Sequence, residues 1–158
     1  MLASILKTNT IMNRNSNYLE NIKTEPNIGK RILAGLIDYL FIGIFYFAYF
    51  YAFGEPNNDG GYTINGMRTL PPLIFWGLFI IGFEQWFGAS LGNQVVGLRP
   101  FSINGINREL TFGQSLKRHL LDLVDMFFFG LIGIILIQKT ERNQRIGDIW
   151  AETIVLKK

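Results

Sequence analysis

Residues 32–53 read ILAGLIDYLFIGIFYFAYFYAF, and Asp38 is the single charged side chain in this stretch. A helix that crosses the hydrocarbon core of a bilayer needs about 20 mainly apolar residues, at a rise of roughly 1.5 Å per residue. Length and composition therefore predict a membrane-spanning helix over residues 32–53. The tyrosines near its end suit the interface between membrane and water.

The composition of the whole chain agrees with an integral membrane protein. Apolar residues make up 49% and charged residues 17% of the sequence, against about 25% charged residues in ordinary soluble domains. The apolar residues are gathered in blocks, which indicates that lipid is part of the solvent. The net charge of +3 then reflects the placement of loops, and we expect no nucleic-acid partner. The absence of cysteine excludes disulfides, thiolate catalysis and Cys-ligated metals.

Two further apolar segments follow. A second span is predicted over residues 71–89, with Pro71 and Pro72 at its entry and Glu84 as its one charge. The third segment, residues 120–137, contains Asp122 and Asp125, so that only residues 126–137 are free of charge. That remainder is too short to span a bilayer alone. The segment is either a full span holding two carboxylates or a re-entrant half-helix, and the sequence leaves both open.

The connecting segments complete the predicted architecture. Residues 1–30 form a polar, flexible tail, because Pro26 and Gly29 disfavour a helix that continues up to the membrane. Within residues 90–119, the runs VVGLRPFSI and INRELTF flank an Asn-Gly pair and predict a small β-hairpin. The apolar run TIVL near the C-terminus is expected to pack back on the domain. The predicted fold class is an all-α membrane protein with two to three transmembrane helices, or four short ones, and the hairpin in a cytoplasmic loop.

Positive charges predict the topology. Four Lys or Arg residues lie in residues 1–30 and Arg31 lies at the mouth of the first span, while one lies in the 54–70 loop, four in residues 90–119 and five in the tail after residue 137. Cytoplasmic loops carry an excess of Lys and Arg, so the 54–70 loop is external and the N-terminus and the 90–119 loop are cytoplasmic. Three simple spans would place the basic tail outside, whereas a re-entrant third segment would place it inside.

Charged side chains in or near the apolar segments are the candidate working parts. They are Arg31, Asp38, Glu84, Arg118, Asp122, Asp125, Arg145 and Asp148. Arg31 and Asp38 are seven residues apart and share one face of a helix, about 10 Å apart along its axis. An Asp at the centre of a span costs about 2.5–3.5 kcal/mol, so Asp38 should face protein or water. The alternative is that Asp38 only cements helix packing.

The other candidates also have two interpretations. Glu84 is either a buried carboxylate or an interfacial one paired with a basic loop residue. Arg118, Asp122 and Asp125 fall at i, i+4 and i+7, which places them on one helix stripe. The two carboxylates should not both ionise easily in a low dielectric, unless the stripe lies on the membrane surface. His119 is expected to be interfacial. Arg145 and Asp148 would be worth little as an exposed pair, but docked against the bundle they would supply charge partners to the spans.

Four motifs occur in order along the chain. RILAGLID holds Arg31 and Asp38, SLGNQVVGLR follows the second span, Arg118 lies in SLKRHLLDLVD, and QRIGDIWAETIV holds Arg145 and Asp148. With these motifs the chain resembles the RDD family of integral membrane proteins, named for one arginine and two aspartates. Asn93 stands where the family usually has Lys, and Pro100 stands where a strand residue is common. The resemblance covers a transmembrane domain over residues 31–156 and leaves the 1–30 tail outside.

The resemblance implies a multi-span protein of the bacterial inner membrane, in a family with members proposed as cation/proton antiporters. One hypothesis is a small transporter or antiporter component that handles monovalent cations or protons and forms homo-oligomers or joins other membrane proteins within the lipid bilayer. The alternative is a membrane scaffold in which the Arg and Asp network is structural. An intramembrane enzyme using Asp122 and Asp125 is disfavoured, so we expect no enzyme activity, no cofactor and no metal.

Overall fold

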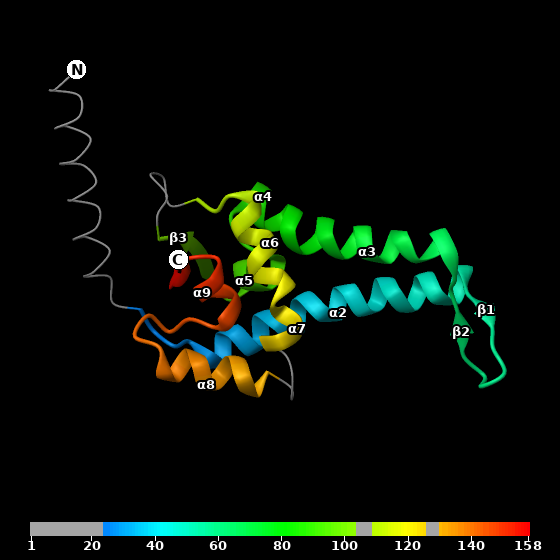
Figure 1. Ribbon diagram of the computed structural model, residues 1–158, viewed down its shortest axis with the longest axis horizontal. Helices are drawn as coiled ribbons and strands as arrows, with labels where there is room; N and C mark the ends of the chain where they lie inside the picture. The colour runs from blue at the N-terminus through cyan, green and yellow to red at the C-terminus, as the bar shows by residue number, and fades with distance from the viewer. Residues whose placement is uncertain (1–23, 104–108, 126–129) are drawn as a thin grey trace, which may run out of the picture.

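A computed structural model describes residues 24–103, 109–125 and 130–158 (Figure 1). The described chain is mostly helical with two small strand pairs. Its elements are α2 (Ile28–Phe53), β1 (Glu55–Pro56), β2 (Tyr62–Thr63), η1 (Gly66–Thr69), α3 (Leu70–Gly77), η2 (Leu78–Gly82), α4 (Phe83–Phe87), α5 (Leu91–Val95), β3 (Leu98–Ser102), α6 (Phe112–Leu120), α7 (Asp122–Asp125), α8 (Leu131–Lys139), α9 (Ile146–Trp150) and β4 (Thr153–Lys157).

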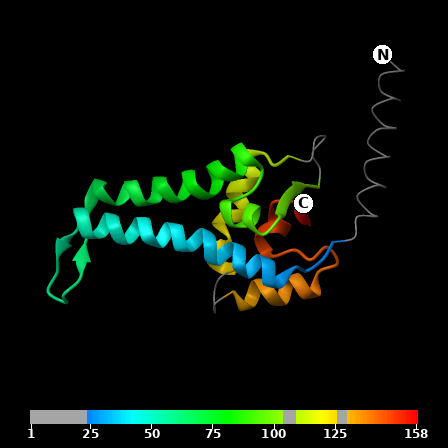
Figure 2. The same ribbon diagram turned by 180° about the vertical axis from the view of Figure 1, so that it is seen from behind.

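Two long apolar helices dominate the structure (Figures 1 and 2). Helix α2 covers Ile28–Phe53, and η1, α3, η2 and α4 follow one another without a break over Gly66–Phe87. Both are long and apolar enough to cross a membrane, as the sequence predicts. Helix α2 begins earlier than expected, at Ile28, directly after Pro26 and Asn27, and it includes Gly29. Most of the predicted 1–30 tail, residues 1–23, lies outside the described residues.

Aromatic side chains hold the two long helices together. The rings of Phe45 and Phe75 stack with centroids 3.7 Å apart, and Phe75 stacks on Phe79 at 5.6 Å. The Tyr46 hydroxyl donates to the carbonyl oxygen of Pro72 at 3.0 Å. Some of the aromatic residues that crowd the second half of α2 therefore pack against the second long helix, while others, such as Phe47, are exposed. At the far end, β1 and β2 pair antiparallel and form a short hairpin between the helices.

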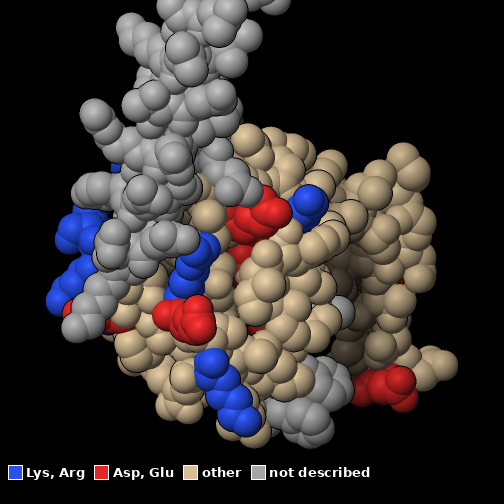
Figure 3. Space-filling model, turned by 60° about the vertical axis from the view of Figure 1, so that its left-hand side comes forward, with Lys and Arg blue, Asp and Glu red and all other residues tan. Residues whose placement is uncertain are grey.

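Elements α5 to β4 gather at the opposite end of the molecule, which we call the compact end (Figures 1 and 2). Figure 3 looks toward this end and shows exposed Lys, Arg, Asp and Glu side chains separated by uncharged surface. Helix α8 lies beside the first half of α2 in both ribbon views. The compact end thus wraps around the start of the first span.

The third apolar segment is divided into short helices within the described residues. Helix α6 ends at Leu120, α7 is a single turn, and α8 starts after Gly130, whose φ of 83° is left-handed. The nine residues of α8 measure about 14 Å at 1.5 Å per residue, far less than the bilayer core. A continuous third span is therefore absent from the described part of residues 120–137. This arrangement agrees with the re-entrant alternative and keeps α9 and β4 at the compact end.

The predicted β-hairpin is wrong in its pairing. Strand β3 pairs antiparallel with β4, in a register that runs from Leu98 opposite Lys157 to Ser102 opposite Thr153. The C-terminal run TIVL packs back on the domain, as expected, and its Ile154 and Val155 are buried. Burial of this apolar run explains why it takes the place beside β3. Part of the predicted second strand, residues 104–108, lies outside the described residues, and Phe112 begins α6.

Candidate functional site

Six charged side chains of alternating sign form a closed circle at the compact end, which we call the charge ring. Its members in order are Arg118, Glu84, His119, Asp122, Arg145 and Asp148. Arg118 joins two of the acids, because its Nη1 lies 2.6 Å from Glu84 Oε2 and its Nε lies 2.9 Å from Asp148 Oδ1. Arg118 is 2% exposed. The ring is therefore an interior feature.

His119 and Arg145 close the ring on the other side. His119 Nε2 lies 3.1 Å from Glu84 Oε2, and its Nδ1 lies 2.8 Å from Asp122 Oδ2. Arg145 Nη1 lies 2.7 Å from Asp122 Oδ1, and its Nε lies 3.8 Å from Asp148 Oδ1. Both nitrogens of His119 donate when the ring is protonated. Each acid in the circle then lies between two bases, and each base lies between two acids.

Two more charged residues attach to the ring from outside. Arg31 of α2 places Nη1 3.2 Å from Asp148 Oδ2, and its Nη2 donates to the carbonyl oxygen of Asn143 at 3.0 Å. Asp125 accepts hydrogen bonds from the backbone N–H groups of Ile146 and Gly147, each at 3.1 Å, and lies 3.9 Å from Arg145. With His119 protonated, the eight residues carry four positive and four negative charges. The assembled set is electrically neutral.

Local sequence places two of the three basic ring members at the end of α6. Thr111 and Gln114 form a capping box that starts this helix, with the Thr111 hydroxyl accepting from Gln114 N and the Gln114 side chain accepting from Thr111 N. Arg118 and His119 fall in its last turn, where positive charge is favourable because the carbonyl ends of a helix are negative. The helix start therefore fixes how far along the helix the two bases lie.

A glycine allows α9 to approach α6. A Cβ placed on Gly147 would lie 2.5 Å from the carbonyl oxygen of Arg118, so only glycine fits at this contact. The next residue, Asp148, then reaches the Arg118 guanidinium, and it also accepts from the backbone N–H of Arg145 at 3.3 Å. The Gly-Asp pair of the QRIGD motif thus combines close packing with charge pairing.

The ring groups outside the two long helices have shifted pKa values. Burial alone would lower the pKa of His119, but the carboxylates of Asp122 and Glu84 outweigh burial and raise the pKa to about 9. For Asp148, burial works against ionisation, yet Arg118, Arg145 and Arg31 lower the pKa to about 2. Burial raises the pKa of Asp125. The network therefore favours a protonated histidine and an ionised Asp148 at neutral pH.

Asp38 is held apart from the ring. Its side chain is buried and accepts from Ser90 Oγ at 2.6 Å and from the backbone N–H of Gly92 at 2.7 Å. Ser90 is also the N-cap residue of α5, and its hydroxyl accepts from Asn93 Nδ2 at 2.8 Å. Asp38 makes no ion pair with any Lys, Arg or His in the part of the chain that the structure describes. It is the one buried carboxylate of the described site that lacks a basic partner.

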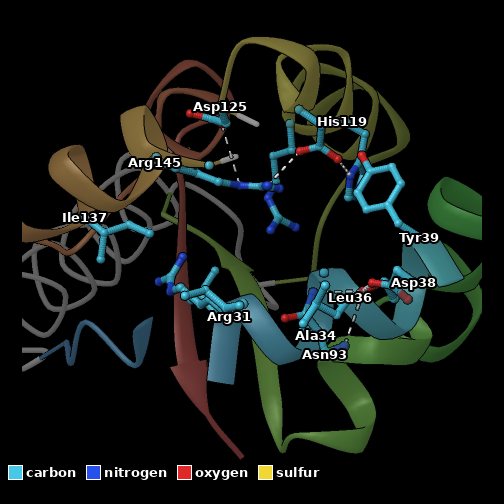
Figure 4. Close-up of a pocket in the computed structure, with 18 of the residues that line it drawn as sticks. Arg31, Ala34, Leu36, Asp38, Tyr39, Asn93, His119, Asp125, Ile137 and Arg145 are labelled. Carbon is cyan, nitrogen blue, oxygen red and sulfur yellow. Dashed lines mark hydrogen bonds and ion pairs between the residues drawn. The ribbon is translucent and has the colours of Figure 1, made fainter. Parts of the chain in front are cut away.

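A cavity of about 450 Å³ separates Asp38 from the ring (Figure 4). Figure 4 shows Asp38 and Asn93 on one wall and Asp125, Arg145 and His119 on the opposite wall. Helices α2 and α8 supply much of the remaining lining, including Ile134 and Ile137. The cavity brings ionisable and apolar side chains together within the compact end.

Every charged residue singled out in the sequence lies in this site, but several have unexpected partners. Arg31 and Asp38 lie along one helix, yet Arg31 contacts Asp148 and Asp38 contacts α5. Glu84 is a buried carboxylate, 2% exposed, and it pairs with Arg118 and His119. Arg145 and Asp148 are docked against the bundle, and Asp148 supplies a partner to Arg31 of α2. Whether these charges carry function stays a prediction.

Two sequence interpretations are corrected by the local geometry. His119 is not an exposed surface residue, because it is 5% exposed and bridges Glu84 and Asp122. Arg118, Asp122 and Asp125 do not form one continuous stripe, because α6 ends at Leu120 and the chain turns at Leu121 before α7. Arg118 therefore pairs with acids from other elements. The i, i+3 spacing of His119 and Asp122 was an available signal for that contact.

Sequence reasoning also missed Ser90 and Gly92, which hold Asp38. A Cβ on Gly92 would collide with the backbone carbonyl of Ala34, so a glycine and a small residue meet where α5 crosses α2. The SLGN stretch carries a capping signal at Ser90, but nothing in it indicates the distant carboxylate. Among the described residues, no three His, Asp or Glu side chains gather in a way that would hold a metal ion.

The comparisons with known proteins agree with these motifs. The profile of the RDD family matches residues 25–152, which include every member of the charge ring and Asp38. No similar protein was found among curated proteins or among solved structures. The matched range covers both long helices and ends just before β4.

Proposed function

The chain belongs to the RDD family, and on that premise we propose that it is a membrane transport component that exchanges a proton for a cation at Asp38. The observation that carries the proposal is the missing basic partner of this carboxylate. The eight other buried or half-buried charges of the site form pairs and sum to zero. Asp38 alone is left with two neutral donors, Ser90 and Gly92.

The chemistry of an unpaired carboxylate in a membrane supports exchange. Taking an ionised carboxylate out of water costs several kcal/mol unless a counter-charge accompanies it. Asp38 therefore has two stable forms, one with a bound proton and one with a cation in the adjoining cavity. The two forms exclude each other, because both use the same carboxylate. Buried ionisable residues in membrane segments commonly serve ion pathways for this reason.

The number of spanning helices and the distribution of charge bear on the oligomeric state and on the orientation in the membrane. Two spanning helices cannot enclose a pathway through a bilayer, so we propose that the working unit contains further copies of this chain. We also propose a multi-pass protein of the bacterial cytoplasmic membrane, with the β1–β2 hairpin outside and the compact end in the cytoplasm. The excess of Lys and Arg in the segments of the compact end supports this orientation.

Everted membrane vesicles containing a pH-sensitive dye test the proposal. Addition of Na⁺ or K⁺ should release protons and change the dye signal in vesicles with the native chain, and Asp38→Asn should abolish the response. Asp59→Asn is the matched control, because Asp59 lies in the exposed turn of the distant hairpin. A response in Asp38→Asn vesicles as large as in native vesicles would refute exchange at Asp38.

The closed charge ring favours a second candidate, a membrane scaffold. In the ring every acid has a basic partner and every base an acidic one, which is the arrangement expected of a permanent structural lock. For a scaffold, Asp38 would serve only to hold α5 on α2. In that case Asp38→Asn should lower the yield of folded protein in detergent. Full yield together with selective loss of ion flux would exclude the scaffold.

A further inference from the structure

The cavity beside Asp38 is much larger than a single inorganic ion needs. Its volume of about 450 Å³ falls within the range of about 300–1,000 Å³ that is typical of sites for organic ligands. A bare metal ion is bound instead by several converging oxygen ligands at short distance. The described residues around the cavity show no such group of acidic side chains or histidine. The space and the ligand set both suit an organic molecule.

The lining reaches the outer surface of a membrane-spanning helix. Ile32 and Leu36 line the cavity, and these side chains are 47% and 64% exposed. Both belong to α2, so the mouth of the cavity opens where lipid would surround the protein. Ile134 and Ile137 continue the apolar lining on the side of α8. A ligand that enters through this mouth comes from the lipid and must carry apolar groups.

The charges that line the cavity favour a positive ligand. Four basic side chains also face it, and each is engaged by at least one acid: Arg31, Arg118, His119 and Arg145. Asp122 and Asp125 line it too, and both lie beside Arg145. Asp38 is the carboxylate left without a base. Tyr39, next in the chain, also lines the cavity and lies near His119 (Figure 4).

From this geometry we propose that the cavity binds a monovalent organic cation with apolar substituents, with Asp38 as its counter-charge. The inference rests on the proposed exchange at Asp38 and names the class of cation that competes with the proton. The apolar part of the ligand lies against Ile134 and Ile137, and its charge lies toward Asp38. Protonation of Asp38 removes the counter-charge and releases the ligand.

Ethidium, a fluorescent monovalent aromatic cation, is a suitable probe for the full-length protein in detergent. We expect saturable binding that weakens as the pH is lowered, since protons compete for Asp38. Asp38→Asn should weaken binding by roughly tenfold or more, the loss that follows removal of one charged contact, while Asp59→Asn should bind normally. Equal binding by Asp38→Asn and the native chain would overturn the proposal.

A second pair of variants tests the cavity without removing a charge. Ile134→Trp places a larger side chain in the lining, whereas Ile135→Trp makes the same change at an exposed position of α8 that does not line the cavity. We expect Ile134→Trp to lose ethidium binding and Ile135→Trp to retain it. Equal binding by the two variants would place the ligand elsewhere and refute the site.

The vesicle assay separates failure of this inference from failure of the proposed function. Ethidium should move the dye signal in native vesicles and not in Asp38→Asn vesicles. If Na⁺ or K⁺ moves the signal through Asp38 while ethidium neither binds nor moves it, proton exchange stands and the organic cation is wrong. If no cation moves the signal, both proposals fall.

Discussion

Asp148→Asn offers the sharpest test of the charge ring. Asp148 is fully buried and its two carboxylate oxygens face three arginines. Oδ1 lies 2.9 Å from Arg118 Nε and 3.8 Å from Arg145 Nε, and Oδ2 lies 3.2 Å from Arg31 Nη1. Asparagine keeps the size of the side chain and one acceptor but removes the charge. The set of eight charges then changes from neutral to one excess positive charge.

The size of the effect follows from this burial. Removing one partner of a buried ion pair costs about 3–5 kcal/mol, because the other charge stays buried without compensation. Arg31 loses the one acid it pairs with among the described residues, whereas Arg118 keeps Glu84 as a partner, so the whole of this range applies. A loss of 1 kcal/mol lowers the melting temperature of a chain of this size by about 2–4 °C, which gives a fall of roughly 6–20 °C for Asp148→Asn.

Thermal unfolding of the purified protein in detergent measures this shift. Glu55→Gln is the matched control, because it removes an acid from the exposed pair with Arg68, whose side chains are 73% and 62% exposed. Exposed pairs contribute about 0–1 kcal/mol, so the control should melt within a few degrees of the native chain. A shift for Asp148→Asn no larger than that of Glu55→Gln would show that the ring does not stabilise the fold.

Three further predictions concern pH, packing and topology. The pKa of His119 rises from 6.5 to about 9 on folding, so its protonation stabilises the fold below about pH 6.5, and this contribution is lost as the pH rises through 9. Melting temperatures between pH 6.5 and 9.5 should therefore fall more steeply for the native chain than for His119→Gln. Parallel curves for the two proteins would contradict the assignment. Gly92→Ala should strongly reduce the yield of folded protein, because the added methyl group would collide with Ala34. Gly43→Ala should be tolerated, because there is open space around Gly43. Equal yields of the two variants would argue against the contact of α5 with α2. Reporters fused after Lys158 and inserted at Asn58 should report opposite sides of the membrane, with the C-terminus cytoplasmic, and reporters on the same side would exclude the proposed topology.

Much of the fold could be predicted because it depends on short stretches of sequence. The first long helix follows from residues 32–53, whose length and apolar composition suit a membrane-spanning helix. Glu84 and Asp38 are easily identified once the apolar segments are assigned, because a charged side chain inside an apolar helix is costly. The pairing of β3 with β4 could not be predicted in the same way. Two segments near position 100 satisfy the rules for a hairpin, and only burial of Ile154 and Val155 decides the pairing.

For the candidate site, the sequence likewise predicted the charged residues but not the contacts between them. Its charged members are identified by residue type and motif, and all of them belong to the matched family range. Their partners are not. His119 looks like an interfacial residue until Glu84 of the second long helix is placed 3.1 Å from it. The sequence places Asp38 on one helix face with Arg31, but only the fold brings Ser90 and Gly92 of the α5 region to it. These contacts arise from packing between elements.

The sequence by itself determined that this protein has two helices of membrane-spanning length and which charges are set among apolar residues. The physical reason is that transfer of a helix into lipid depends on about 20 consecutive residues and on nothing distant. Only the tertiary structure decided that six of the charges close into a ring, that Asp38 is left without a base, and that a cavity adjoins it. Arg31 and Asp148 are 117 residues apart in the chain, and Coulomb energy depends on distance in space.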